Sequence, residues 1–99
     1  MLESYVEKSL RDVFLRYKEV DEVLLFGSRA RGDHRYNSDI DLCLFGNSIT
    51  HKVLANIHMD IEEINTIYSF DILCFNEIKK QELIDNILRE GVCIYGKEA

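Results

Sequence analysis

The 99-residue sequence has no proline, no tryptophan, few cysteines and fewer basic than acidic residues. Its 12 Lys and Arg against 18 Asp and Glu give a net charge of −6, the wrong sign for nonspecific binding to nucleic acid. Apolar runs extend over only a few residues, whereas a membrane-spanning helix needs about 20. The opening residues carry no basic stretch followed by an apolar one, so no secretion signal is expected. We therefore expect a protein that binds neither nucleic acid directly nor membranes.

The three cysteines form an odd set without a C-x-x-C pair, which favours neither a disulfide framework nor a zinc site. Cys43, Cys74 and Cys93 each lie in a short apolar run, which predicts three small buried side chains on strands. This usage is typical of a reduced, cytoplasmic protein. With 46% hydrophobic residues the chain can form one core, so we predict a single domain over residues 1–99.

Hydrophobic periodicity alternates between the helical and the strand pattern. The expected elements are a helix within 2–17, a strand at 23–26, one or two helical turns at 28–32, a strand at about 39–45, a helix across 53–64, a strand at 69–75, a helix around 83–88 and a strand at 92–95. Ser48 or Thr50 is expected to cap the helix that follows, Gly32 to form a left-handed cap, and Gly91 to end the last helix. This order predicts an α/β or α+β two-layer domain.

Carboxylates interrupt two of the apolar strands. Alternation along a strand places Asp39 and Asp41 on one face, and Asp71 lies in the middle of another apolar run. Two such carboxylates about 5 Å apart repel by roughly 3 kcal/mol at an effective dielectric constant near 20. A divalent cation reverses the sign of this interaction, and Mg²⁺ binds oxygen ligands of this kind together with water and substrate phosphates. The Asp39–Asp41 pair is therefore a candidate metal site.

A candidate phosphate site precedes this pair. Gly27 and Ser28 end the first strand directly before a helix-forming stretch, where backbone N–H groups favour an anion. Glycine lets the backbone approach a ligand closely, and the serine hydroxyl can donate to a phosphate oxygen. Arg29 and Arg31 are candidate phosphate contacts, with solvated side chains as the alternative. An ordinary turn with a capping serine would explain Gly27 and Ser28 alone, but their combination with the carboxylates favours a nucleotide site.

The run G-S-R-A-R-G at 27–32, followed by S-D-I-D-L at 38–42, resembles the G-S-x10-D-x-D signature of the DNA polymerase β-like nucleotidyltransferase superfamily. Within it, the sequence is most similar to the minimal nucleotidyltransferases (MNT proteins) encoded beside HEPN ribonuclease toxins. The resemblance covers most of the chain. It implies a polymerase β-like core with a small mixed sheet of about four strands and helices packed on it.

The resemblance also implies roles for individual residues. Gly27 and Ser28 would hold the triphosphate of ATP, Asp39 and Asp41 would bind one or two Mg²⁺ ions, and Asp71 would help bind the second ion and accept the proton of the attacking hydroxyl. It further implies that the acceptor is a tyrosine of a cognate HEPN toxin, which AMP transfer silences, and that the two proteins form a hetero-oligomer.

Two other functions are compatible with the sequence: an antitoxin that neutralises its partner by binding alone, and nucleotide transfer to a small molecule. A template-directed polymerase is disfavoured, because no residues remain for a second domain and the net charge is negative. Among the remaining polar residues, Ser38 is expected to shape its loop and His34 to be a surface residue. The acidic residues within 60–63 are expected on the solvated face of their helix.

Overall fold

The computed structural model describes residues 2–33, 35 and 37–96. Its elements are α1 (Ser4–Phe14), β1 (Glu22–Phe26), α2 (Ser28–Arg31), β2 (Ile40–Phe45), α3 (His51–Glu62), β3 (Phe70–Cys74), a 3₁₀ turn η1 (Phe75–Glu77), α4 (Gln81–Glu90) and β4 (Val92–Gly96). Each predicted helix and strand is present. No helix in the described part of the chain is both long and apolar enough to cross a membrane.

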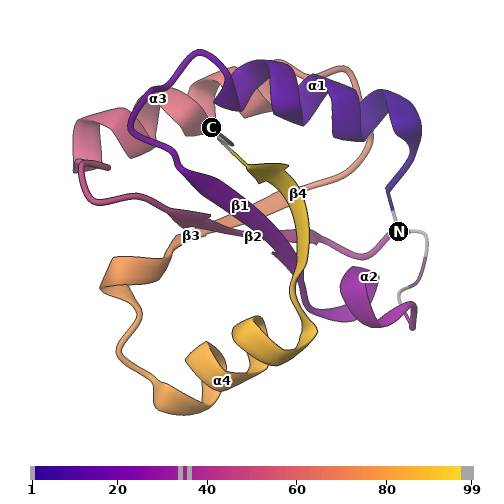
Figure 1. Ribbon diagram of the computed structural model, residues 1–99. Coiled ribbons are helices and arrows are strands. Elements are labelled where there is room, and N and C mark those ends of the chain that lie inside the picture. The colour runs from indigo at the N-terminus through magenta and orange to yellow at the C-terminus, as the bar shows by residue number, and fades with distance from the viewer. Residues whose placement is uncertain (1, 34, 36, 97–99) are drawn as a thin grey trace.

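The four strands form one sheet in the order β3-β2-β1-β4. Strand β1 pairs antiparallel with both β2 and β4. Strands β2 and β3 are parallel, because α3 returns the chain to the end of the sheet at which β2 begins. Both edge positions are thus taken by late strands, β3 and β4 (Figure 1). The predicted α/β class with a small mixed sheet of four strands is confirmed.

Helices cover both faces of this sheet (Figure 1). Helices α1 and α3 pack on one face and bury the larger core, which includes Leu10, Phe14, Leu25, Leu42 and Ile57. Helix α4 packs on the opposite face over a smaller cluster of Phe26, Cys43 and Ile87. Helix α4 therefore adds a partial third layer to the predicted two-layer arrangement. It leaves one end of its sheet face uncovered, and a site can form there.

Local signals in the sequence explain most element ends. Thr50 caps α3, since its hydroxyl accepts a hydrogen bond from the backbone N–H of Val53 at 3.2 Å. Gly32 ends α2 in the left-handed conformation with φ +83°. Gly91 ends α4, although in an extended conformation. The expected strand starting at Asp39 begins one residue later, at Ile40, so Asp39 lies in the loop that leads into β2.

The three cysteines are free thiols, and two of them are buried as predicted. The prediction is wrong for Cys93, which is exposed. Its strand β4 is an edge strand, and Cys93 pairs with Leu24 on the sheet face where only α4 packs. Burial at this position depends on neighbours that the local apolar run does not specify.

Candidate functional site

Three carboxylates gather at one end of the α4 face of the sheet. Asp41 on β2 lies directly opposite Asp71 on β3 in the parallel register. Neighbouring strands lie about 4.8 Å apart and directly paired side chains share a face, so these two carboxylates are adjacent. Asp39 precedes Asp41 by two positions, in the loop that leads into the same strand. The sequence located these residues, and the sheet register explains why Asp71, distant in sequence, joins them.

Asp41 is the central member of this carboxylate group. It is half-buried, whereas Asp39 and Asp71 are exposed. Burial raises the pKa of Asp41, and the negative charges of Asp71 and Asp39 raise it further; Arg31 and Arg29 oppose this shift. A carboxylate that is both desolvated and surrounded by like charge favours a bound proton or cation. The site therefore concentrates negative potential around Asp41.

Gly27 places the end of β1 against this carboxylate. Its backbone has φ +78° and ψ −155°, a conformation that is essentially restricted to glycine. A Cβ atom at Gly27 would collide with Oδ2 of Asp41. The adjacent residue, Phe26, pairs with Asp41 across the antiparallel register. The predicted phosphate-binding residue and the predicted metal-binding pair are thus in direct contact, which the sequence spacing alone did not establish.

Ser28 begins helix α2 and is half-buried beside Gly27. The carbonyl of Gly27 accepts hydrogen bonds from the N–H groups of Ala30 and Arg31, both at 3.1 Å, and this closes the first turn. N–H groups at the very start of a helix commonly lack a backbone partner within the helix and can bind an anion. A triphosphate contact by Gly27 and Ser28 stays a prediction, and the local geometry is compatible with it.

Arg29 is buried, with only 4% of its surface exposed. Its guanidinium donates two hydrogen bonds to the carbonyl of Ser38, at 2.9 Å from Nη2 and 3.3 Å from Nε. It also lies 4.5 Å from the ring centroid of Tyr68, within cation–π range. A solvated side chain, the alternative considered for this residue, is wrong here. A phosphate contact by Arg29 stays a prediction beside this role in fixing the loop.

Arg31, in contrast, is exposed and forms ion pairs with Asp33 and Glu90, both at 3.2 Å. The hydrogen bonds that its guanidinium donates to Asp33 and Glu90 raise the pKa of Arg31. Because exposed ion pairs contribute little to stability, the guanidinium can exchange them for another anion at small cost. A phosphate contact by Arg31 stays a prediction.

Ser38 has the loop-shaping role expected from the sequence. Its hydroxyl accepts a hydrogen bond from the N–H of Arg35 at 2.9 Å, and its own N–H donates to the carbonyl of Arg35 at 2.9 Å. Together with the contact from Arg29, these bonds fix the residue that directly precedes Asp39. His34 in the same loop lies outside the described residues.

Sequence reasoning missed the packing of Arg29 on Tyr68. The two residues are remote in the chain, and neither carries a local pattern that marks the other. It also misplaced Asp60, which is half-buried because it accepts a hydrogen bond from the hydroxyl of Tyr17 and pairs with Arg16 at 3.4 Å. Burial and the neighbouring Asp60 raise the pKa of Tyr17 to about 12. This contact joins the end of α1 to α3 and is remote from the carboxylates.

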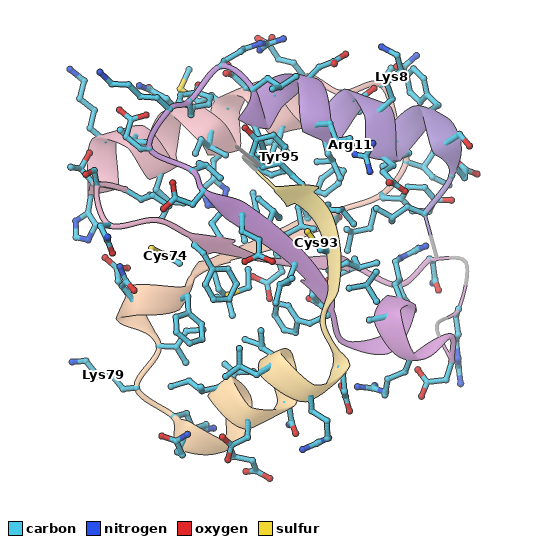
Figure 2. The ribbon with its side chains drawn as sticks, in the orientation of Figure 1. Lys8, Arg11, Cys74, Lys79, Cys93 and Tyr95 are labelled. Atoms are coloured by element: carbon cyan, nitrogen blue, oxygen red, sulfur yellow. The ribbon has the colours of Figure 1, made fainter. Side chains whose placement is uncertain are left out.

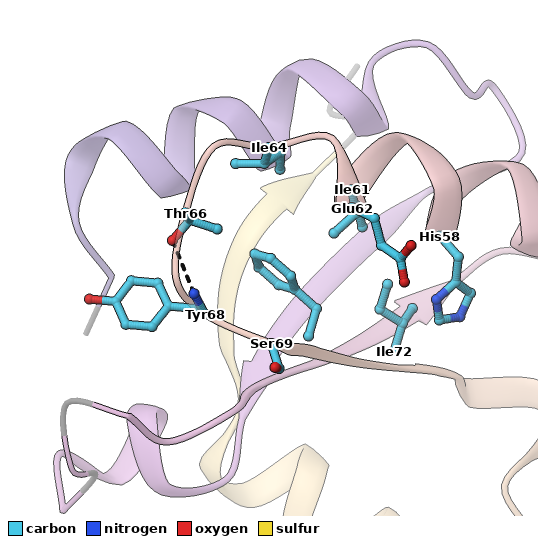
Figure 3. A pocket seen from close by; sticks show the side chains of 9 residues that line it. His58, Ile61, Glu62, Ile64, Thr66, Tyr68, Ser69 and Ile72 are labelled. Carbon is cyan, nitrogen blue, oxygen red and sulfur yellow. Dashed lines mark hydrogen bonds between the residues drawn. The ribbon is translucent and has the colours of Figure 1, made fainter.

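A cavity of about 350 Å³ lies between the end of α3 and strand β3 (Figure 3). Ile61, Phe70 and Ile72 line its apolar part, and His58 and Glu62 line its rim. Phe70 and Ile72 contribute to the core under α1 and α3. The cavity therefore opens on the sheet face opposite Asp71 and is separate from the carboxylate site.

The carboxylates do not form a complete metal cage by themselves. Within the described ranges, no group of three or more His, Cys, Asp or Glu side chains is arranged to hold a metal ion alone. An open site of this kind suits Mg²⁺, which uses one or two carboxylates and completes its shell with water and substrate phosphates. Asp41, its in-register neighbour and the adjoining Gly27 thus fit a cation that arrives with a phosphorylated substrate.

The sequence of residues 8–99 matches a family model described as polymerase beta, nucleotidyltransferase. The chain belongs to this nucleotidyltransferase family. The match covers nearly the whole chain, so the fold and the three carboxylates lie within one nucleotidyltransferase domain. The resemblance carried by residues 27–42 is thereby confirmed at the level of the family. A comparison with curated proteins gives no match.

Solved structures share the nucleotidyltransferase fold. A chain in a toxin–antitoxin crystal structure with AMP-PNP superposes with a TM-score of 0.74 at 16% identity, covering 93% of this chain and 74% of the other. A complex of tri-AMPylated Shewanella oneidensis HEPN toxin with MNT antitoxin gives a TM-score of 0.71 at 12% identity, over 97% and 74% of the two chains. A candidate minimal nucleotidyltransferase gives 0.67 at 24% identity, over 87% and 86%. Likeness at such identities shows the fold alone.

Proposed function

We propose that this nucleotidyltransferase is Mg²⁺-dependent and transfers AMP from ATP to a tyrosine of a HEPN-type toxin, for which it acts as antitoxin. The observation that carries the chemistry is the register of the site: Asp41 lies opposite Asp71 and in contact with Gly27. This arrangement brings a phosphate-binding turn and adjacent carboxylates to one place, as an in-line phosphoryl displacement needs.

The site has two parts, one that binds phosphate and one that binds the metal ion. Gly27 and Ser28 bind the triphosphate through backbone N–H groups and the serine hydroxyl. Asp39 and Asp41 would hold Mg²⁺, and Asp71 would help to hold a second ion. When bound, the cation neutralises phosphate charge and stabilises the attacking and leaving oxygens.

Asp71 accepts the proton in the transfer step. The tyrosine hydroxyl oxygen forms a bond to the α-phosphorus of ATP, the bond from that phosphorus to the bridging oxygen breaks, and pyrophosphate leaves with the electron pair. The phenolic proton passes to the Asp71 carboxylate, which is exposed on the outermost strand of the site and so accessible to an acceptor. A base must lie within hydrogen-bond reach of the proton that it takes.

The choice of partner is supported by likeness. The similar structures include a tri-AMPylated HEPN toxin in complex with an MNT antitoxin and a toxin–antitoxin structure with AMP-PNP. This likeness supports a hetero-oligomer with the toxin and ATP as the nucleotide. The free cysteines support the proposed cytoplasmic location.

The test combines the double substitution Asp39→Asn/Asp41→Asn with labelled ATP, Mg²⁺ and the purified HEPN protein. We expect at least about a 100-fold loss of label transfer, because the cation and the charge stabilisation that it supplies are lost. Asp21→Asn/Asp85→Asn removes the same charge at exposed positions and should leave transfer unchanged. Equal labelling by the Asp39/Asp41 variant and the wild type would contradict a mechanism of AMP transfer that depends on these two carboxylates.

The same experiment separates the alternatives. If the Asp39/Asp41 variant loses transfer but still silences the toxin at equal concentration, neutralisation is by binding alone. If the wild type consumes ATP with small hydroxyl compounds and leaves the HEPN protein unlabelled, the acceptor is a small molecule. Either result would replace the proposed acceptor.

A further inference from the structure

The outer edge of β3 bears an apolar groove, which we call the β3 groove. It has a volume of about 430 Å³. Leu54 and Ile72 line it from the α3 side of the sheet, and Leu73, Ile78 and Leu83 line it from the α4 side. Because its lining comes from both faces, the groove wraps around the edge of the sheet. Strand β3 is the terminal strand there, and its outward main-chain groups are available for pairing.

The groove adjoins the catalytic end of the same strand. Leu73 lies two residues beyond Asp71, on the same face and about 7 Å along the strand. The proposed phosphate site directly follows strand β1, β2 carries the central carboxylate, and β3 is the outermost of the three strands. A nucleotide held at Gly27 therefore leaves the outer side of β3 as the open approach to Asp71.

The rim of the groove is basic in an otherwise acidic protein. Lys79 and Lys80 line it and are exposed, and neither forms an ion pair with any residue that the structure describes. The chain as a whole carries a net charge of −6. Glu77 is the one acidic residue among those that line the groove, and its carboxylate lies 3.0 Å from Nε2 of His51. Two unpaired lysines beside apolar side chains are complementary to a segment that is apolar on one side and acidic on the other.

We propose that the β3 groove binds an extended, apolar and acidic segment of the acceptor protein, and that this docking delivers the acceptor hydroxyl to Asp71. The segment aligns along the edge of β3, its apolar side chains enter the groove between Leu73 and Ile78, and its carboxylates pair with Lys79 and Lys80. Pairing at an exposed sheet edge supplies affinity through main-chain hydrogen bonds and specificity through side-chain pockets. This inference rests on the proposed function, since it concerns the acceptor of that reaction.

The test reverses the charge of the rim with Lys79→Glu/Lys80→Glu. Titration calorimetry with the HEPN protein is expected to show at least a tenfold rise in Kd at low salt, and a smaller difference in 1 M salt, where charges are screened within about 3 Å. Binding of AMP-PNP, which does not use the groove, should stay unchanged. Ile78→Ser tests the apolar part separately and should weaken binding at both salt concentrations.

Lys8→Glu/Lys18→Glu is the matched control, because it makes the same charge change at exposed positions on and after α1. Figure 2 shows Lys8 on the side of the molecule away from Cys74 and Lys79. The control should bind the HEPN protein like the wild type. If the wild type and the Lys79/Lys80 variant bind the HEPN protein equally well, the docking proposal is wrong and the proposed function is unaffected. If the wild type neither binds nor modifies the HEPN protein, the proposed function fails in its choice of acceptor.

Discussion

At the scale of single residues, Asp41 is placed where ionisation is unfavourable. Burial and two neighbouring carboxylates raise its pKa, so the folded protein binds a proton there more readily than the unfolded chain does. Folding free energy is therefore lost as pH rises from the unfolded-state pKa through the higher folded-state value. Sites that store such repulsion are stabilised by substitutions that abolish their function.

Asp41→Asn is accordingly expected to stabilise the protein without nucleotide, by about 1 kcal/mol at about pH 7. For a chain of this size that corresponds to a rise in Tm of about 4–8 °C. Thermal unfolding of both proteins across a pH series should show the gain shrinking as pH falls and Asp41 of the wild type becomes protonated. An equal or lower Tm for the variant at neutral pH would contradict the assignment of repulsion to this residue.

Gly27 and Gly32 form a natural pair for comparison, since both have a positive φ, +78° and +83°. Gly27→Ala adds backbone strain and a clash with the Asp41 carboxylate, so we expect a loss of more than about 2 kcal/mol together with loss of nucleotide transfer. Gly32→Ala meets no atom within 4 Å and should cost only about 1 kcal/mol, with transfer retained. Urea unfolding and transfer rates measure both, and similar effects at the two positions would contradict a specific role for Gly27.

At the scale of elements, the site depends on three segments that Arg29 joins. The residue lies on α2, its hydrogen bonds reach Ser38 in front of β2, and its guanidinium stacks on Tyr68 in front of β3. The segments that carry Gly27 and the three carboxylates are thus connected through the buried guanidinium of Arg29. Arg29 is a positioning residue in this structure.

Arg29→Met is expected to destabilise the protein by about 2–3 kcal/mol, because the carbonyl of Ser38 loses a charged donor. Amide hydrogen exchange in the loop before β2 should accelerate, and kcat should fall more than the Kd for AMP-PNP rises. Arg29→Lys keeps the charge but not the two-pronged contact and should restore part of both effects. Unchanged amide hydrogen exchange in that loop of the Arg29→Met variant would contradict the positioning role of Arg29.

At the scale of the whole molecule, the proposed substrate with its cation would offset the repulsion among the carboxylates around Asp41. A ligand that binds only the folded state stabilises it by about 2.7 kcal/mol at 100 times its Kd. Mg²⁺ with AMP-PNP should therefore raise the Tm of the wild type by at least about 10 °C. Asp39→Asn/Asp41→Asn should abolish this shift although it starts from a more stable protein. A shift that persists in the variant would place the nucleotide elsewhere.

The molecule as a whole also shows how far sequence reasoning reaches. The elements, the capping role of Thr50 and the left-handed Gly32 followed from local periodicity and local sterics. The exposure of Cys93 and the partial burial of Asp60 did not, because each depends on which remote element packs beside it. The nucleotidyltransferase family followed from the residues at 27–42, and the family match confirms it.

By itself the sequence determined which residue types stand at each position and which local structure they adopt: a glycine and serine after one strand, and carboxylates on two others. Only the tertiary structure decided that β3 lies beside β2 in the register that pairs Asp71 with Asp41, and that Gly27 meets that same carboxylate. It also decided that the outer edge of β3 is open and that Arg29 is buried. The physical reason is range: dihedral preferences and side-chain alternation act between near neighbours in the chain, whereas strand order and register depend on packing the entire core.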